Sequence, residues 1–170
     1  MSRTKWFERK FDFSFQENIF PEILDRLRAT PTRLEGVVKG VDEKTLVRKE
    51  GNSWSIKENI GHLIDLEPLW VGRLDDILHH EEYLRAADLQ NQKTHEANHN
   101  ATSVTELLKA FASARSMTVR RLHSLPTEQL YWSALHPRLK TPMRTMDHFL
   151  FVAEHDDHHL ATIEEIISHE

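Results

Sequence analysis

Four long stretches of the sequence carry apolar residues at helical spacing. An amphipathic helix must bury its apolar stripe, and four such helices do so most simply against one another. We therefore predict an all-α fold, a four-helix bundle. The composition agrees, because the 170 residues include only five Gly and six Pro, and this length suits one domain over residues 1–170.

The first two predicted helices differ in how clearly they begin. The first is expected over about residues 15–38, with kinks or breaks at Pro21 and Pro31. The second has a sharper start, because Ser55 and Glu58 have the spacing of a capping box in which each residue satisfies the other's backbone N–H. Its apolar stripe then continues for more than five turns.

The last two predicted helices follow polar connections. Ser103 and Glu106 again have capping-box spacing and should begin the third helix. Before the fourth helix stands the Pro-containing segment "ALHPRLKTPM", in which Thr141 can cap and Pro142 can occupy the first helical position. The fourth helix is then expected to run to about Ser168.

The charge of the chain excludes two classes of partner. Its 22 basic and 27 acidic residues are mixed along the sequence, so they form no basic footprint for nucleic acid or for an anionic membrane. The first residues, "MSRTKWFERKFDFSF", carry charges where a signal peptide needs an apolar region, and we predict a cytoplasmic protein. Because the chain has no cysteine, any metal site must be built from His, Asp and Glu.

Histidines are concentrated in "FVAEHDDHHLATI" on the fourth predicted helix. His155 and His159 are four residues apart, so they lie about 40° apart around the helix and can hold one divalent metal, whereas His158 points away. An isolated pair of this kind is more often a polar helix flank. His62, at the edge of the apolar stripe on the second helix, could complete a site of three ligands where the two helices face each other.

A second histidine pair stands in "HEANH", which matches the His-Glu-x-x-His pattern of zinc proteases. That pattern requires a helix, and the surrounding "DLQNQKTHEANHNATS" has no apolar periodicity. We interpret the segment as a polar connecting loop, from which His95 and His99 could still line the rim of a pocket.

Three charged residues lie inside predicted apolar arcs and need partners there. Glu67, Arg115 and Asp156 could pair with one another to fix helix register, or Glu67 or Asp156 could orient a ligand imidazole. The loop residue His136 is interpreted as a solvated histidine, with a substrate contact or proton shuttle as the weaker reading.

The segments "WSIKENIGHLIDLEPLW", "HPRLKTPM" and "AEHDDHHLATI" resemble the DinB-like family of metal-binding four-helix bundles, over nearly the whole chain. In that family one histidine of the second helix and an i, i+4 pair of the last helix bind a divalent metal, which corresponds to His62, His155 and His159. The resemblance also implies an up-down-down-up bundle and frequent homodimers. Characterised relatives transfer low-molecular-weight thiols or carry out related isomerisation and hydrolysis.

Two functional hypotheses follow from these observations. The first is an enzyme in which His62, His155 and His159 hold Zn²⁺ or Ni²⁺ and leave a position open for a water or a small-molecule substrate such as a thiol. No residue pattern identifies a general base, and catalytic residues stay unassigned. The second hypothesis is a non-catalytic bundle in which the metal joins two helices and an apolar surface pairs with another subunit.

Overall fold

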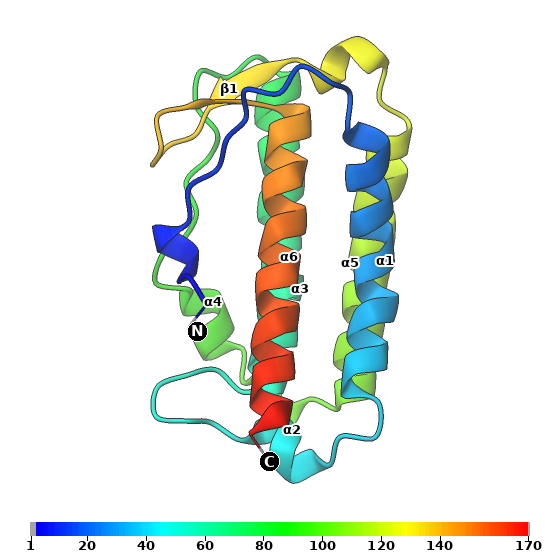
Figure 1. Cartoon of the computed structure of the whole chain (residues 1–170), viewed down its shortest axis with the longest axis vertical. Coiled ribbons are helices and arrows are strands. Elements are labelled where there is room, and N and C mark those ends of the chain that lie inside the picture. Colours follow the sequence, from blue (N-terminus) through cyan, green and yellow to red (C-terminus); the bar gives the residue numbers. More distant parts are fainter. Residues whose placement is uncertain (1–2, 170) are drawn as a thin grey trace.

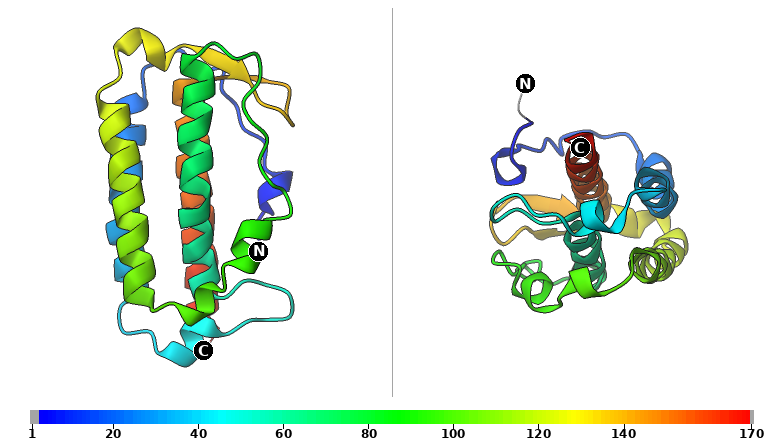
Figure 2. Two further views of the ribbon diagram at one scale, coloured as in Figure 1. Left: turned by 180° about the vertical axis from the view of Figure 1, so that it is seen from behind. Right: turned by 90° about the horizontal axis from the view of Figure 1, so that it is seen from below.

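Four long helices form the body of the protein in a computed structural model that describes residues 3–169 (Figure 1). They are α1 (Phe20–Val38), α3 (Ile56–Leu78), α5 (Val104–His123) and α6 (Thr145–Ser168). Around the bundle, seen end-on in Figure 2, α1 lies beside α5, α5 beside α3, α3 beside α6, and α6 beside α1. The predicted all-α four-helix bundle is confirmed.

The directions of the four helices follow the predicted up-down-down-up order. In Figure 1, α1 and α6 run one way and α3 and α5 run the other way. Because α3 and α5 are parallel, the chain between them must return along the whole bundle. Residues 79–103 make this connection and contain the short helix α4 (Gln92–Glu96) and a 3₁₀ turn (His99–Ala101).

The other connections are shorter. Helix α2 (Glu43–Val47) joins α1 to α3, and a 3₁₀ turn (Thr127–Leu130) and the antiparallel strands β1 (Ser133–Leu135) and β2 (Pro142–Arg144) join α5 to α6. A further 3₁₀ turn (Trp6–Glu8) lies in the N-terminal segment. In Figure 1 this segment, α4 and the strands lie on the same side of the bundle, next to α3 and α6.

Both predicted capping boxes begin their helices as expected. The Ser55 hydroxyl accepts the backbone N–H of Glu58 at 3.1 Å, and the Glu58 carboxylate accepts the backbone N–H of Ser55 at 2.8 Å. Ser103 and Glu106 make the same reciprocal pair, with both distances 3.2 Å. These contacts satisfy backbone donors that have no partner within the first helical turn.

The first helix begins later than predicted, and neither proline breaks it, which leaves a kink as the remaining form of that prediction. The helix begins at Phe20, whose N–H is accepted by the side chain of Asn18, and Pro21 fits into the first turn, where a missing N–H costs nothing. The helix also continues through Pro31. Proline cannot donate to the carbonyl of Leu27 four residues earlier, and Arg115 donates to that carbonyl instead, at 3.3 Å.

The predicted start of the fourth helix is also wrong. Pro142 lies in β2 opposite Leu135, and the helix begins three residues later, at Thr145. The carboxylate of Asp147 accepts the backbone N–H of Arg144 at 2.8 Å and so caps the helix. The helix start predicted from Thr141 and Pro142 missed the hairpin, because the second strand forms only by pairing with β1.

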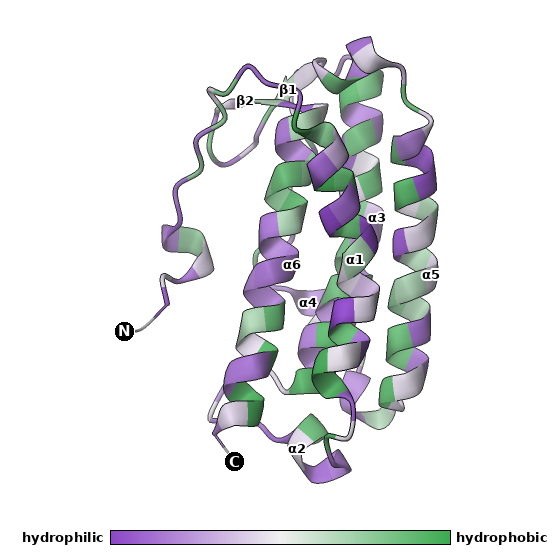
Figure 3. Cartoon of the chain, turned by 45° about the vertical axis from the view of Figure 1, so that its right-hand side comes forward, coloured by the Kyte–Doolittle hydropathy of each residue, from purple (hydrophilic) through white to green (hydrophobic). Residues whose placement is uncertain are grey.

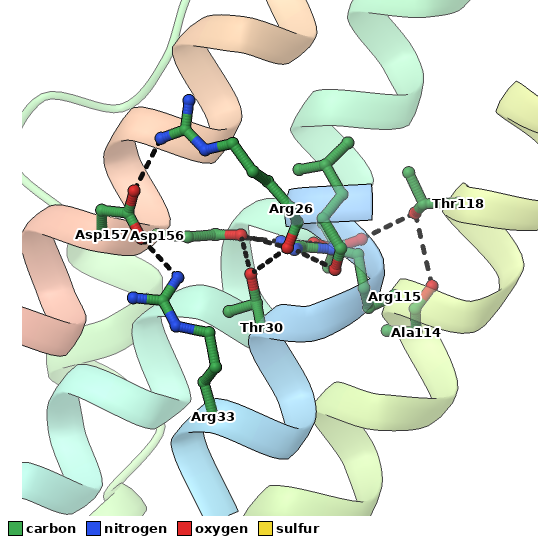
Figure 4. Close-up of polar contacts among 10 residues, drawn as sticks. Arg26, Thr30, Arg33, Ala114, Arg115, Thr118, Asp156 and Asp157 are labelled. Carbon is green, nitrogen blue, oxygen red and sulfur yellow. Dashed lines mark hydrogen bonds and ion pairs between the residues drawn. The ribbon is translucent and has the colours of Figure 1, made fainter. Parts of the chain in front are cut away.

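The helices are amphipathic, as their purple and green faces in Figure 3 show. A buried polar cluster divides the core between them into two apolar halves. Arg115, 1% exposed, donates to Glu67 at 2.8 Å and to Asp156 at 3.0 Å. Thr118 donates to Glu67 at 2.6 Å and Thr30 to Asp156 at 2.9 Å (Figure 4). This is the predicted pairing that fixes helix register. Within the described residues, no helix is long and apolar enough to cross a bilayer.

Candidate metal centre

The structure brings together the three histidines that were predicted as ligands. His62 lies on α3, and His155 and His159 lie one turn apart on the facing side of α6. One ring nitrogen of each lies within 4.8 Å of the others, and all three side chains are buried. The ring centroids are 4.5 Å apart for the α6 pair and 4.9 and 5.3 Å apart across the helices.

Asn59 fixes the orientation of the His159 ring. The Asn59 amide nitrogen donates to the carbonyl of Ser55 at 2.8 Å, so its oxygen faces His159 and accepts from Nδ1 at 2.8 Å. This contact holds the proton of a neutral imidazole on Nδ1. The lone pair on Nε2 of His159 therefore points toward the other two histidines, as a metal ligand requires.

A chain of hydrogen bonds does the same for His62. The Thr94 hydroxyl donates to Asp65 at 2.9 Å, and it is therefore available to accept from Nδ1 of His62, 3.2 Å away. His99 also donates to Asp65, at 2.8 Å. The proton of His62 is thus held on Nδ1, and its Nε2 is left for a metal.

Close packing at Gly61 makes this chain of hydrogen bonds possible. A Cβ atom built on Gly61 would lie 2.2 Å from ring atoms of His99. The absence of a side chain there lets the His99 ring lie against α3 and reach Asp65. Gly61, which has no side chain, thereby contributes to the position of His62.

His155 completes the fit to a metal ion. Its Nε2 lies 3.2 Å from Nε2 of His159, and a proton or a cation must lie between two imidazole nitrogens this close. Two nitrogens that bind one Zn²⁺ at about 2.0–2.1 Å with tetrahedral angles are about 3.3 Å apart. The distance therefore matches a shared divalent metal. Nδ1 of His155 is buried and has no partner among the described residues.

Burial keeps these imidazoles neutral. It lowers the pKa of His62 to about 4, although Asp65 acts in the opposite direction. Burial, reinforced by the neighbouring histidines, holds the pKa values of His155 and His159 well below the usual range. Only neutral imidazole binds a metal, so the site favours the ligating form at neutral pH.

The three histidines lie in the wall of a cavity of about 760 Å³. Its lining includes Trp6 and Phe7 of the N-terminal segment and Pro137 from the loop between the strands. The Trp54 ring also lines it and lies 4.5 Å from the His62 ring, centroid to centroid. A metal at the histidines would therefore face a space large enough for a small molecule.

Several other predictions about this region can be compared with the structure. His158 is not part of the three-histidine group, as predicted, but its side chain lines the same cavity. The predicted loop around "HEANH" contains α4, which ends before His99, so the two histidines share no helix and do not form a protease-like pair. His95 lines the cavity, whereas His99 is buried against Asp65.

Two further interpretations are wrong. His136 is not solvated: it is 3% exposed and lines the cavity, because the hairpin folds its loop back toward α6. Glu67 and Asp156 do not orient a ligand, since both carboxylates bond to Arg115 and neither lines the cavity. Asn59, Thr94 and Asp65 take that role.

Sequence reasoning missed these three orienting residues. Asn59 and Asp65 stand three residues before and after His62, a helical spacing that places all three near one face of α3 and could have revealed them. Thr94 offered no such signal, because it comes from the long connection between α3 and α5.

The chain belongs to the DinB superfamily, whose family model matches residues 26–163. No curated protein matches the chain in sequence. The fold is similar to that of YfiT from Bacillus subtilis, which is described as a probable metal-dependent hydrolase with an unusual four-helix bundle topology. That similarity has a TM-score of 0.77 at 19% identity and covers 93% of this chain and 91% of YfiT.

Proposed function

We propose that this protein is a metal-dependent enzyme in which His62, His155 and His159 hold a divalent metal ion, Zn²⁺ or Ni²⁺. The observation that carries the proposal is a set of three neutral, mutually facing imidazoles in the wall of a cavity of about 760 Å³. Three protein ligands leave a coordination position for a water or substrate, which is typical of catalytic rather than structural zinc sites.

The chemistry that a divalent ion supplies at such a site is Lewis acidity, which makes a water or a thiol at the open position a stronger acid. The protein's contribution is positional. Asn59 and Thr94 keep the ligand lone pairs aimed at one point, and Trp54 covers the His62 ring on the cavity side. The reaction that best suits the site is hydrolysis, as described for YfiT, because it needs only a water and one substrate.

Thiol transfer is a second candidate. The chain has no cysteine, so a thiol would have to enter as a separate small molecule, and the cavity has room for one beside an electrophile. The competing hypothesis is a metal that only joins α3 to α6 in a binding protein. We also propose a homodimer, because the family resemblance implies one.

Cobalt substitution tests the proposal. Co²⁺ bound by three imidazoles with an accessible fourth position should change its visible spectrum on titration with 2-mercaptoethanol or azide. His62→Ala should lose the cobalt, whereas His158→Ala, the matched control from the same cavity wall, should retain it.

Two results would overturn the proposal. Full cobalt occupancy in His62→Ala would remove His62 from the ligand set. A silent spectrum with stoichiometric cobalt would indicate a closed site and favour the non-catalytic bundle. Thiol-dependent conversion of an electrophile, set against hydrolysis without added thiol, then separates the two reactions.

A further inference from the structure

Arg73 is a buried cation that no carboxylate neutralises directly. It lies on α3, is 2% exposed and lines the cavity. Its Nε donates to the carbonyl of Arg85 at 3.0 Å. Across residues 3–169, Arg73 forms no ion pair, and its two Nη atoms make no hydrogen bond. A buried guanidinium with one acceptor is costly, so the Nη donors of Arg73 stand out in the cavity wall.

The charges around Arg73 leave this end of the cavity positive. Burial lowers the pKa of Arg73 to about 10, with Asp76 favouring the charge and Arg138 opposing it, so the group is still charged at neutral pH. Asp76 is itself occupied by Arg85, whose backbone N–H and Nη2 both donate to it at 2.8 Å. Asp75 also favours the charge of Arg85 but is paired with Arg121, so the guanidinium groups around Arg73 outnumber the carboxylates.

His136 adds a neutral donor beside Arg73. Its Nδ1 accepts the backbone N–H groups of Arg138 and Leu139 at 3.2 and 3.1 Å, which places the proton of the neutral ring on Nε2. Burial, together with Arg73 and Arg138, lowers the pKa of His136 to about 4 and keeps the ring neutral. The Nε2–H has no protein acceptor among the described residues, and the side chain lines the cavity.

Arg73 and the metal centre lie along the same face of α3. The eleven residues from His62 to Arg73 turn the helix by a net of only about 20° and advance it by about 16 Å. Both side chains lean toward the helix N-terminus, so the rise of about 16 Å sets the scale of the separation, and the longer Arg73 side chain can span part of it. Trp70 and Leu66 line the cavity between them.

We propose that Arg73 and His136 form a subsite for an oxyanion, a carboxylate or phosphate group, at the end of the cavity nearest the β1–β2 loop. The two Nη atoms of Arg73 would hold the oxyanion through paired hydrogen bonds, and His136 Nε2 would donate a third. The subsite adds a substrate class to the proposed function. Its role in catalysis rests on that function, whereas its binding of an anion does not. The substrate is then an anionic small molecule that reaches from Arg73 to the three histidines.

Calorimetric titration with benzoate and its uncharged analogue benzamide tests the subsite on the full chain, both metal-loaded and after chelation. Benzoate should bind the unmodified protein more tightly than benzamide in both states. Arg73→Met should weaken benzoate binding by about 10–100-fold, as expected for charge-assisted hydrogen bonds, and leave benzamide unaffected. Inorganic phosphate, titrated in the same way, shows which oxyanion fits better.

Further variants separate recognition from folding. His136→Asn keeps an acceptor near the place of Nδ1 but lacks the Nε2 donor, and it should weaken benzoate binding by about 2–10-fold. Arg73→Lys should retain part of the affinity, and Arg120→Gln, an exposed arginine on α5, should change nothing. Because Arg73 has no ionic partner among the described residues, the melting temperature of Arg73→Met without anions should fall by no more than the loss of its bond to Arg85 and its contact with the Trp70 ring implies.

The subsite is wrong if Arg73→Met binds benzoate like the unmodified protein, or if the unmodified protein does not distinguish benzoate from benzamide. A fall in the melting temperature of Arg73→Met as large as that of Arg115→Met, in anion-free buffer, would also contradict it, because it would indicate a structural role. Failure of the proposed function gives a different result. The protein would then bind no metal, but its metal-free form would still bind benzoate more tightly than benzamide.

Discussion

Two buried arginines, Arg115 and Arg73, show how differently the centre of the bundle and the cavity wall use polar groups. Arg115, in the centre of the bundle, bonds to two carboxylates and to a backbone carbonyl. Burial disfavours its charge, but Asp156 and Glu67 together raise its pKa above the usual value. Arg73, in the cavity wall, has one backbone acceptor and no carboxylate partner within residues 3–169.

The same contrast appears between two neighbours on α6. Asp156 faces the bundle centre and accepts from Arg115, whereas His155 lines the cavity and keeps a buried nitrogen that no described residue pairs with. Successive helical residues are about 100° apart, so one helix serves both environments. Fully paired groups indicate a structural role. Unpaired groups at a cavity wall indicate where a ligand binds.

Removal of the paired charge should have the largest effect. Arg115→Met leaves Glu67 and Asp156 buried without their cation, and it should lower the free energy of unfolding by about 3–5 kcal/mol. Urea denaturation of metal-free protein measures this loss. Arg73→Met is the matched control and should show a much smaller loss, because it removes one hydrogen bond to a carbonyl and leaves no buried carboxylate without its cation. Equal stability of the two variants would remove the distinction between the two arginines.

Loss of an orienting hydroxyl should have an intermediate effect on the cavity side. Thr94→Val keeps the shape of the side chain but cannot accept from His62, and it should weaken metal binding by about 10–100-fold, or about 1.4–2.7 kcal/mol. Thr94→Ser retains the hydroxyl and should bind metal nearly as well as the unmodified protein. Competition with a chelating dye gives the affinities. Unchanged affinity in Thr94→Val would show that Thr94 does not position His62.

Mild acidification should have the smallest effect per residue, and it should act through the buried histidines. Burial is the main cause that lowers the pKa values of His62 and His136 to about 4 and of His148 to about 3. The unfolded chain therefore takes up protons first, near pH 6.5, and these groups lose their stabilising contribution as the pH falls from there toward 4.

Between pH 7 and pH 6 each of these histidines should contribute a loss of less than about 1 kcal/mol, with a steeper decline below pH 6. Urea denaturation of chelated protein at several pH values measures the slope. Stability that rises on acidification from pH 7 to pH 5 would contradict neutral, buried histidines.

Local sequence patterns determined much of this structure before any tertiary contact was known. The capping pairs at Ser55 and Ser103 and the apolar periodicity predicted where two helices begin, because such interactions reach only three or four residues along the chain. The i, i+4 spacing of His155 and His159 is local in the same sense. Their association with His62 came from the family resemblance and from the rule that bundle sites use facing helices.

Tertiary structure alone decided which distant segments meet. The β1–β2 hairpin, which shortened the fourth helix and buried His136, depends on pairing between two three-residue strands that have no strong signal separately. Thr94 reaches His62 because the long connection between α3 and α5 returns along the bundle. A sequence shows that Arg73 and Arg115 are charged. Whether a buried charge has a partner depends on the residues that folding brings within hydrogen-bonding distance, and this difference separates the structural arginine from the proposed ligand-binding one.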